Sequence, residues 1–182
     1  MALTPRFVRI AALFYGAFVA AAALWNGLRG RDFHLFGDSA SVGILLGFLS
    51  AVLTVSLGLL LYRASSVVRE VSNELAPMLI DGSSRTGLIL ISIFSGVGEE
   101  ALFRGAVQPE FGLIVAAVSF GILHVGSDRR YLLWTGWAVL AGLLFGGLYT
   151  VTGGLLAPIL AHVLHNAATL LIWRRARKTV PV

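Results

Sequence analysis

The chain has 182 residues, of which 57% are hydrophobic and only 13% are charged. A soluble domain carries about 25% charged residues, so the composition excludes an ordinary soluble protein and indicates a membrane protein. Cysteine is absent, which excludes a disulfide framework, a thiolate nucleophile and a cysteine-based metal site. The formal net charge of +5 suits anionic lipid headgroups. Because the basic residues form no patch, we expect no nucleic-acid partner.

Six apolar segments approach the roughly 20 residues that cross a bilayer. We expect spans over residues 7–28, 42–62, 86–107, 111–125, 131–151 and 155–173. The first is too long for a signal-peptide core and is followed by no convincing cleavage site, so we take it as a span. The sequence therefore predicts an all-α fold, a polytopic membrane helix bundle of about six spans.

The most polar part of the chain lies between the second and third spans, at residues 63–85. Apolar side chains recur there at helical spacing among charged and polar ones. This pattern predicts an amphipathic helix at the membrane interface, although a cytoplasmic connector also fits. Pro77 and the Asp81-Gly82 pair are expected to end the helix.

Basic residues are divided unevenly between the two sides that six spans define. The side of the amino terminus receives Arg6, Arg9, Arg63, Arg69, Arg85, Arg129, Arg130 and the basic tail. The other side receives only Arg29, Arg31 and Arg104. By the positive-inside rule, both termini are expected in the cytoplasm. We expect one membrane domain over 1–182, made of amino-terminal spans and connector (1–85), a core (86–173) and a basic tail (174–182).

The third predicted span ends with Glu99, Glu100 and Arg104. An ionisable side chain at membrane depth costs about 2.5–3.5 kcal/mol on insertion scales, so it is a candidate for function. On a helix, Glu100 and Arg104 form an i,i+4 pair and Glu99 points about a third of a turn away. Arg104 can then neutralise one carboxylate and leave the other free for chemistry. A salt bridge that only marks a helix end fits the same residues.

More polar residues fall in the fourth and sixth spans. Phe120 and His124 are four residues apart, as are His162 and Asn166, and His165 is adjacent to the second pair. Each alone fits a satisfied core residue, and His165 fits a mere neighbour. Together with the acidic pair and its arginine, they lie on three spans that can surround a common cavity. Nothing comparable occurs in the first two spans.

These residue types suit peptide-bond hydrolysis without a covalent intermediate. A carboxylate and a histidine can hold a water and take its proton, and an imidazole and an amide can donate to an oxyanion. A serine protease is disfavoured because Ser95 lacks a Gly-x-Ser-Gly context, and an aspartyl protease because a second intramembrane Asp is missing. A zinc site from His124, His162 and a glutamate has acceptable ligand types. It lacks a His-Glu-x-x-His motif and is the weaker alternative.

Three motifs in order resemble those of one family of intramembrane glutamic endopeptidases, known as CPBP (CAAX protease and bacteriocin-processing, or Abi). They are Glu99-Glu100-x-x-x-Arg104, Phe120-x-x-x-His124 and His162-x-x-x-Asn166. The resemblance covers about half of the chain, residues 86–173, which makes this segment the expected catalytic core.

The resemblance implies a role for each matching residue. Glu99 is expected to be the general base that activates water, and His124 helps to hold that water. His162 and Asn166 are expected to form the oxyanion site. No cofactor and no obligatory metal are implied, and zinc stays the weaker alternative.

Glu100, Arg104 and Phe120 are implied as supporting residues. Many relatives carry about two more spans, so the resemblance leaves open whether a partner or a second copy in a homo-oligomer completes the cavity. The expected substrate is a protein or peptide with a membrane-associated C-terminal segment, such as a sorting tag, a bacteriocin or pheromone precursor, or a CAAX-like tail. The expected location is a bacterial inner membrane. A non-proteolytic scaffold, immunity protein or chaperone on the same fold is the alternative class.

Overall fold

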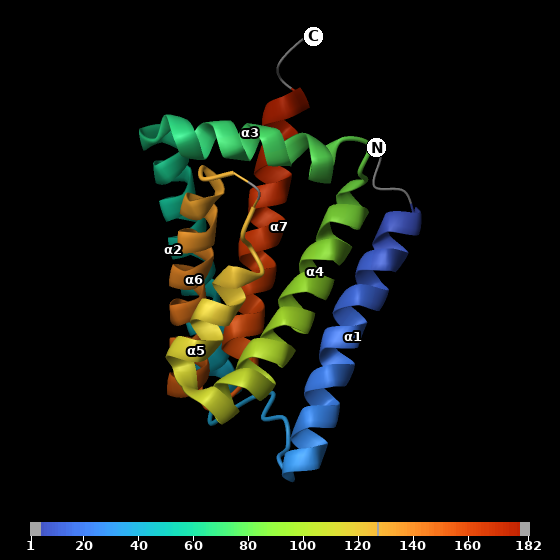
Figure 1. Ribbon diagram of the computed structural model, residues 1–182, viewed down its shortest axis with the longest axis vertical. Helices are drawn as coiled ribbons and strands as arrows, with labels where there is room; N and C mark the ends of the chain where they lie inside the picture. Colours follow the sequence, from blue (N-terminus) through green and yellow to red (C-terminus); the bar gives the residue numbers. More distant parts are fainter. Residues whose placement is uncertain (1–4, 127, 179–182) are drawn as a thin grey trace.

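The structure, a computed structural model, describes residues 5–126 and 128–178. Within these ranges every regular element is a helix (Figure 1). The elements are α1 (Pro5–Arg29), α2 (Ala40–Ala64), α3 (Ser66–Ile80), α4 (Arg85–Leu102), the π-helical turn η1 (Phe103–Val107), α5 (Gln108–Ile122), α6 (Tyr131–Thr152) and α7 (Leu156–Lys178). The prediction of an all-helical polytopic membrane bundle is confirmed.

Five helical stretches in the described part of the chain are long and apolar enough to cross a membrane. One of them, Arg85–Ile122, joins the third and fourth predicted spans into 38 continuous residues. Within this stretch the chain turns back after α4, so that α5 runs beside α6 (Figure 1). Since α5 has 15 residues and a helix rises 1.5 Å per residue, it is shorter than the ~30 Å bilayer core. The fourth predicted span is thus a short returning helix.

The chain bends within α5, at Gly112. Its φ of 85° and ψ of 168° interrupt the helical conformation, and only glycine adopts such a conformation readily. Pro109, which follows the third predicted span, stands in the first turn of α5. Proline is tolerated there because its missing N–H would have no helical acceptor.

The predicted amphipathic helix is α3, which crosses one end of the bundle (Figure 1). It continues through Pro77 to Ile80, so Pro77 does not end it. The end comes one turn later, where Asp81 leaves the helix and Gly82 takes a φ of 73°. The start of α1 and the end of α7 lie at the same end of the bundle as α3 (Figure 1). Their cytoplasmic location stays a prediction.

Small residues bring α1 close to α4. A Cβ atom added to Gly98 would lie only 2.8 Å from the Cβ and the carbonyl oxygen of Tyr15. Further along the same interface, Ala22 packs with Ala101 and Ala106. Because α4 carries the acidic pair, this contact places one side of α1 against the candidate site.

Candidate active site

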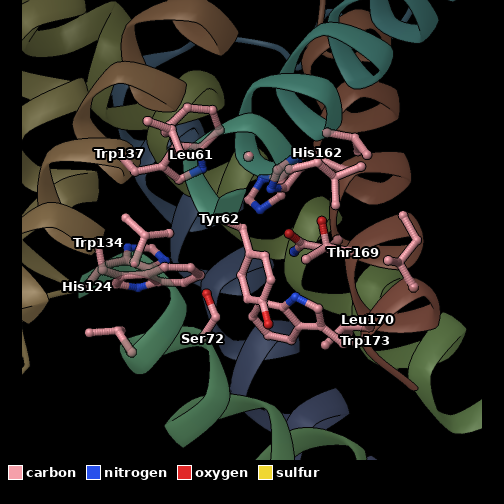
Figure 2. Close-up of a pocket in the computed structure, with 18 of the residues that line it drawn as sticks. Leu61, Tyr62, Ser72, His124, Trp134, Trp137, His162, Thr169, Leu170 and Trp173 are labelled. Atoms are coloured by element: carbon pink, nitrogen blue, oxygen red, sulfur yellow. The ribbon is translucent and has the colours of Figure 1, made fainter. Parts of the chain in front are cut away.

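A cavity of about 300 Å³ lies between the helices, with residues of α3 lining one end (Figure 2). Its walls come from α1, α2, α4, α6 and α7. The cavity is lined by all four residues predicted to act directly, which are Glu99, His124, His162 and Asn166. Residues far apart in the sequence are therefore brought to one enclosed space.

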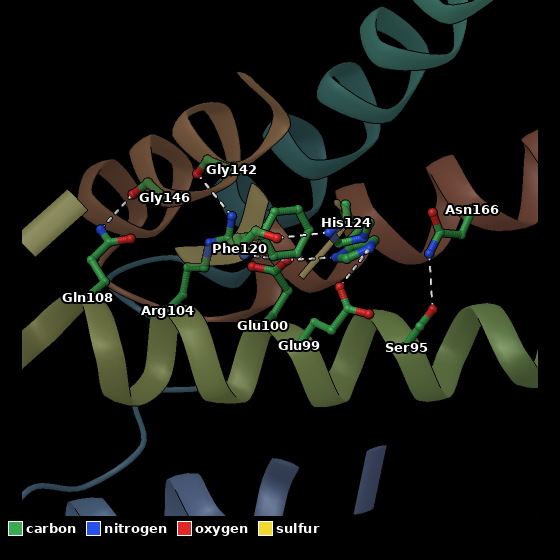
Figure 3. A network of polar contacts seen from close by, with 11 residues as sticks. Ser95, Glu99, Glu100, Arg104, Gln108, Phe120, His124, Gly142, Gly146 and Asn166 are labelled. Atoms are coloured by element: carbon green, nitrogen blue, oxygen red, sulfur yellow. Dashed lines mark hydrogen bonds and ion pairs between the residues drawn. The ribbon is translucent and has the colours of Figure 1, made fainter. Parts of the chain in front are cut away.

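The supporting residues centre on Glu100 (Figure 3), which is not among the residues that line the cavity. Its Oε1 atom accepts hydrogen bonds from Arg104 Nη1 at 3.0 Å and from His162 Nδ1 at 2.7 Å. Glu100 and Arg104 are both completely buried. The i,i+4 pair is confirmed, and it lies in the interior of the bundle, across the junction of α4 and η1. A buried ion pair of this kind leaves an uncompensated charge when either partner is removed.

Arg104 is also held by groups outside the ion pair. Its Nη2 atom donates to the Gly142 carbonyl at 2.9 Å. Its guanidinium carbon lies 4.7 Å from the centre of the Phe120 ring and 5.7 Å from that of Phe145. Since Arg presents donors in a rigid planar fork, these contacts fix its position. The ring face of Phe120 therefore helps to hold the guanidinium of Arg104.

His162 connects the buried pair to the cavity. Its Nδ1 atom faces Glu100, whereas its Nε2 atom lies 4.0 Å from Glu99 Oε2. The ring is enclosed by Phe120 and Phe145, with centroid distances of 5.8 and 5.3 Å. Because Nδ1–H is used on Glu100, Nε2 can donate only when the ring is an imidazolium. In that state the two carboxylates, Arg104 and His162 sum to zero charge.

His124 presents the opposite hydrogen-bonding character. Its Nδ1 atom lies 2.8 Å from the Phe120 carbonyl oxygen, which only accepts, so Nδ1 carries the proton. The Nε2 lone pair is then free on the cavity side. We expected His124 within a span, but it follows the last residue of α5 in a turn. Thr135 Oγ1 donates to the His124 carbonyl at 3.1 Å and holds that turn against α6.

Asn166 is oriented by two serines of α4. Its Nδ2 atom donates to Ser95 Oγ at 3.0 Å, and Ser95 in turn donates to the Ser92 carbonyl at 3.3 Å. This chain fixes which end of the amide is NH₂ and leaves its second N–H for the cavity. Ser95, considered above as a nucleophile, thus holds Asn166 in the structure.

Sequence reasoning missed polar residues on the first two helices. From α1, Tyr15 lines the cavity together with Glu99. From α2, Thr54 bonds to His165 at 3.0 Å, and His165 also lines the cavity. The statement that the first two spans hold nothing comparable is therefore wrong. A single Tyr or Thr in an apolar helix cannot be recognised as a site residue until its partner is known.

No three His, Cys, Asp or Glu side chains within residues 5–126 and 128–178 are grouped so as to hold a metal ion. Glu99 and His162 approach each other, and Nδ1 of His162 and of His124 each face a protein acceptor.

Comparison with known proteins agrees with this geometry. Residues 82–168, which include every predicted site residue, match the family described as type II CAAX prenyl endopeptidase Rce1-like. Over this segment the chain is similar to the Rce1-like family. The resemblance to CAAX-type proteases is thereby confirmed.

One curated relative of this Rce1-like chain is the uncharacterized protein YpbD of Bacillus subtilis (strain 168). It is 34% identical over 80 residues, which are 44% of this chain and 42% of YpbD. The match thus spans less than half of that relative's length. No solved structure matches the chain significantly.

Proposed function

We propose that the chain is an intramembrane glutamic endopeptidase that hydrolyses a peptide bond near the membrane-embedded C-terminal region of its substrate. The observation that carries the proposal is the meeting of Glu99, His124, His162 and Asn166 at one cavity. The Rce1-like match over the same residues supports the reaction class.

The first step uses the two acceptors of the cavity. A water donates one hydrogen bond to the Glu99 carboxylate and a second to His124 Nε2. A lone pair of the water oxygen then points toward the substrate carbonyl. Glu99 takes the proton as the water oxygen bonds to the carbonyl carbon. General-base catalysis of this kind typically contributes 10²–10⁴-fold. A tetrahedral oxyanion results.

The second step uses the donors on α7. The His162 imidazolium Nε2–H and the free Asn166 N–H bind the oxyanion, and one such donor is typically worth about 10²–10³ in rate. Glu100 accepts from His162 Nδ1 and so orients the ring, as the carboxylate of a catalytic triad does. Glu99 then gives its proton to the departing nitrogen, the carbon–nitrogen bond breaks, and an acid and an amine leave.

The substrate class follows from the location of the site. The cavity lies within helices that are apolar enough to cross a bilayer, so the cleaved bond must reach membrane depth. Sorting tags, bacteriocin or pheromone precursors and CAAX-like tails satisfy this requirement. We place the protein in a bacterial inner membrane, with α3 on the cytoplasmic side as the positive-inside rule requires.

The test is cleavage of a panel of C-terminal membrane-anchored peptides by purified protein, read by mass spectrometry. We expect one bond of at least one peptide to be cut, with cleavage lost in Glu99→Gln and unaffected by chelators. Exposed His34→Gln is the matched control and should cleave normally. Equal processing by Glu99→Gln would overturn the glutamic mechanism. Loss on chelation with recovery on added zinc would favour a zinc protease, and a panel left uncut would favour a non-proteolytic role.

A further inference from the structure

His165 is a polar cavity residue that the proposed reaction leaves unused. It lies on α7 between His162 and Asn166 and lines the same cavity. Its ring centre is 6.2 Å from that of Trp137, a residue of α6 labelled in Figure 2. Positions 162, 165 and 166 share one helical face, so all three side chains can reach one substrate.

The partner of His165 fixes its hydrogen-bonding character. Thr54 Oγ1 is within hydrogen-bonding distance of the Ser50 carbonyl at 2.9 Å and of the Ala51 carbonyl at 3.1 Å. Its single hydrogen is therefore used on the backbone of α2. Toward His165 Nδ1, 3.0 Å away, the hydroxyl can only accept. His165 thus carries its proton on Nδ1 and keeps the lone pair of Nε2 free.

A peptide in this cavity requires such an acceptor. Every backbone N–H that leaves water must find a partner, since an unpaired buried polar group is costly. Glu99 and His124 are occupied by the attacking water in the proposed mechanism. Asn166 and the charged His162 are donors there. Apart from the amide oxygen of Asn166, His165 Nε2 is the acceptor among these five residues that the proposed reaction leaves unused.

We propose that His165 Nε2 accepts a hydrogen bond from a backbone N–H of the substrate close to the cleaved bond, which makes His165 a substrate-binding residue and the substrate an extended peptide at that point. The inference rests on the proposed function, because it assumes a peptide in the cavity. Thr54, buried at 3% exposure, is the positioning residue that holds the imidazole.

The experiment combines enzyme variants with altered substrates. A peptide cleaved by the wild type is prepared as a series in which each amide near the cleaved bond is replaced in turn by an ester, which removes one N–H. The series is assayed with wild type, His165→Leu and His165→Gln. The matched control is His34→Leu, which changes an exposed histidine outside the cavity. Thermal unfolding in detergent checks that each variant is folded.

We expect one ester position to lower kcat/KM of the wild type by about tenfold or more, the usual effect of leaving a buried acceptor unpaired. The same ester should change His165→Leu by less than about twofold. With the unmodified peptide, His165→Leu should raise KM by about tenfold at nearly constant kcat, the pattern of lost uniform binding. His165→Gln should recover part of the loss, because its carbonyl supplies an acceptor.

Two outcomes would overturn the inference. Esters that affect wild type and His165→Leu equally at every position would show that His165 binds no substrate amide. A His165→Leu protein that loses thermal stability but keeps its KM would show that the contact with Thr54 only joins α2 to α7. Both leave the proposed function standing, whereas a wild type that cuts no peptide would overturn the proposed function and this inference together.

Discussion

At the scale of single residues, Glu99 and Glu100 are neighbours in the chain with different surroundings. Glu99 lines the cavity beside Tyr15 and His162. Glu100 is completely buried and bonded to Arg104 and His162. Because the two side chains leave the helix about 100° apart, we expect Glu99 to take part in the chemistry and Glu100 to support the structure.

This difference predicts contrasting effects of the same substitution. Glu100→Gln removes the charge that compensates buried Arg104, so it should destabilise the fold by about 3–5 kcal/mol. Glu99→Gln should leave stability nearly unchanged and abolish activity. Thermal unfolding of the two variants in one detergent measures the difference. Equal stability of both variants would contradict the structural role of Glu100.

Tyr15 is predicted to position Glu99. Tyr15→Phe keeps the ring contacts with Phe14 and Phe18, at 5.2 and 5.9 Å, and removes only the hydroxyl. Loss of the hydroxyl should lower kcat by up to about tenfold, the upper end of the 0.5–1.5 kcal/mol that one hydrogen bond contributes, with KM unchanged. Steady-state kinetics measure both constants. A changed KM at constant kcat would assign Tyr15 to substrate binding.

Most of the site was predictable from the sequence because its residues are costly in lipid. Glu99, Glu100 and Arg104 are conspicuous in an apolar run, and their spacing fixes which of them pair. The pairing of His162 with Glu100 was not predictable, since it depends on the register of α7 against α4. Tyr15 and Thr54 were missed for the same reason, because each is unremarkable until its partner is known.

At the scale of elements, α3 is tied to the turn before α6 through Arg130. Arg130 Nη1 lies 2.7 Å from Glu74 and 3.6 Å from Glu70, both on α3. Asp128 orients Arg130 by accepting from its backbone N–H at 2.9 Å and from its side chain at 3.1 Å. Since Val71 of α3 lines the cavity, this ionic contact holds a helix over the candidate site.

The contact with Asp128 predicts a dependence on acid. The backbone N–H and guanidinium of Arg130 hold the pKa of Asp128 below its ordinary value. A carboxyl with a lowered folded-state pKa stabilises the fold above its unfolded pKa, about 3.9, and loses that effect as pH falls through the folded value. Hydrogen exchange of α3, corrected for intrinsic rates, should therefore be constant from about pH 7 to 5 and rise below about pH 4. Asp128→Asn should show faster exchange already at neutral pH, and equal exchange in both proteins would contradict the contact.

The helices themselves were predicted well and their connections less well. The lengths of the apolar segments predicted α1, α2, α6 and α7, and the helical spacing of apolar residues predicted α3. The short α5 was taken for a span because composition does not show where Gly112 takes its positive φ. A bend depends on the backbone dihedral angles, which cannot be read from a run of apolar residues.

At the scale of the whole molecule, most basic residues of the sequence fall in segments at the end of the bundle that α3 crosses. Because the chain lacks cysteine, single cysteines report which end faces the cytoplasm. In intact cells, Asp32→Cys in the loop after α1 should react with an impermeant thiol reagent, and Arg129→Cys before α6 should react only after lysis. The reverse pattern would contradict the cytoplasmic placement of the termini.

The central claim is that Glu99 activates a water and does not itself attack the substrate. The most direct measurement is a single turnover of a substrate peptide in ¹⁸O-labelled water, with enzyme in excess. The peptide product and the enzyme are then both analysed by mass spectrometry. The account predicts one heavy oxygen in the new C-terminal carboxylate and none in the Glu99 side chain. Heavy oxygen in Glu99, with an unlabelled product, would contradict it.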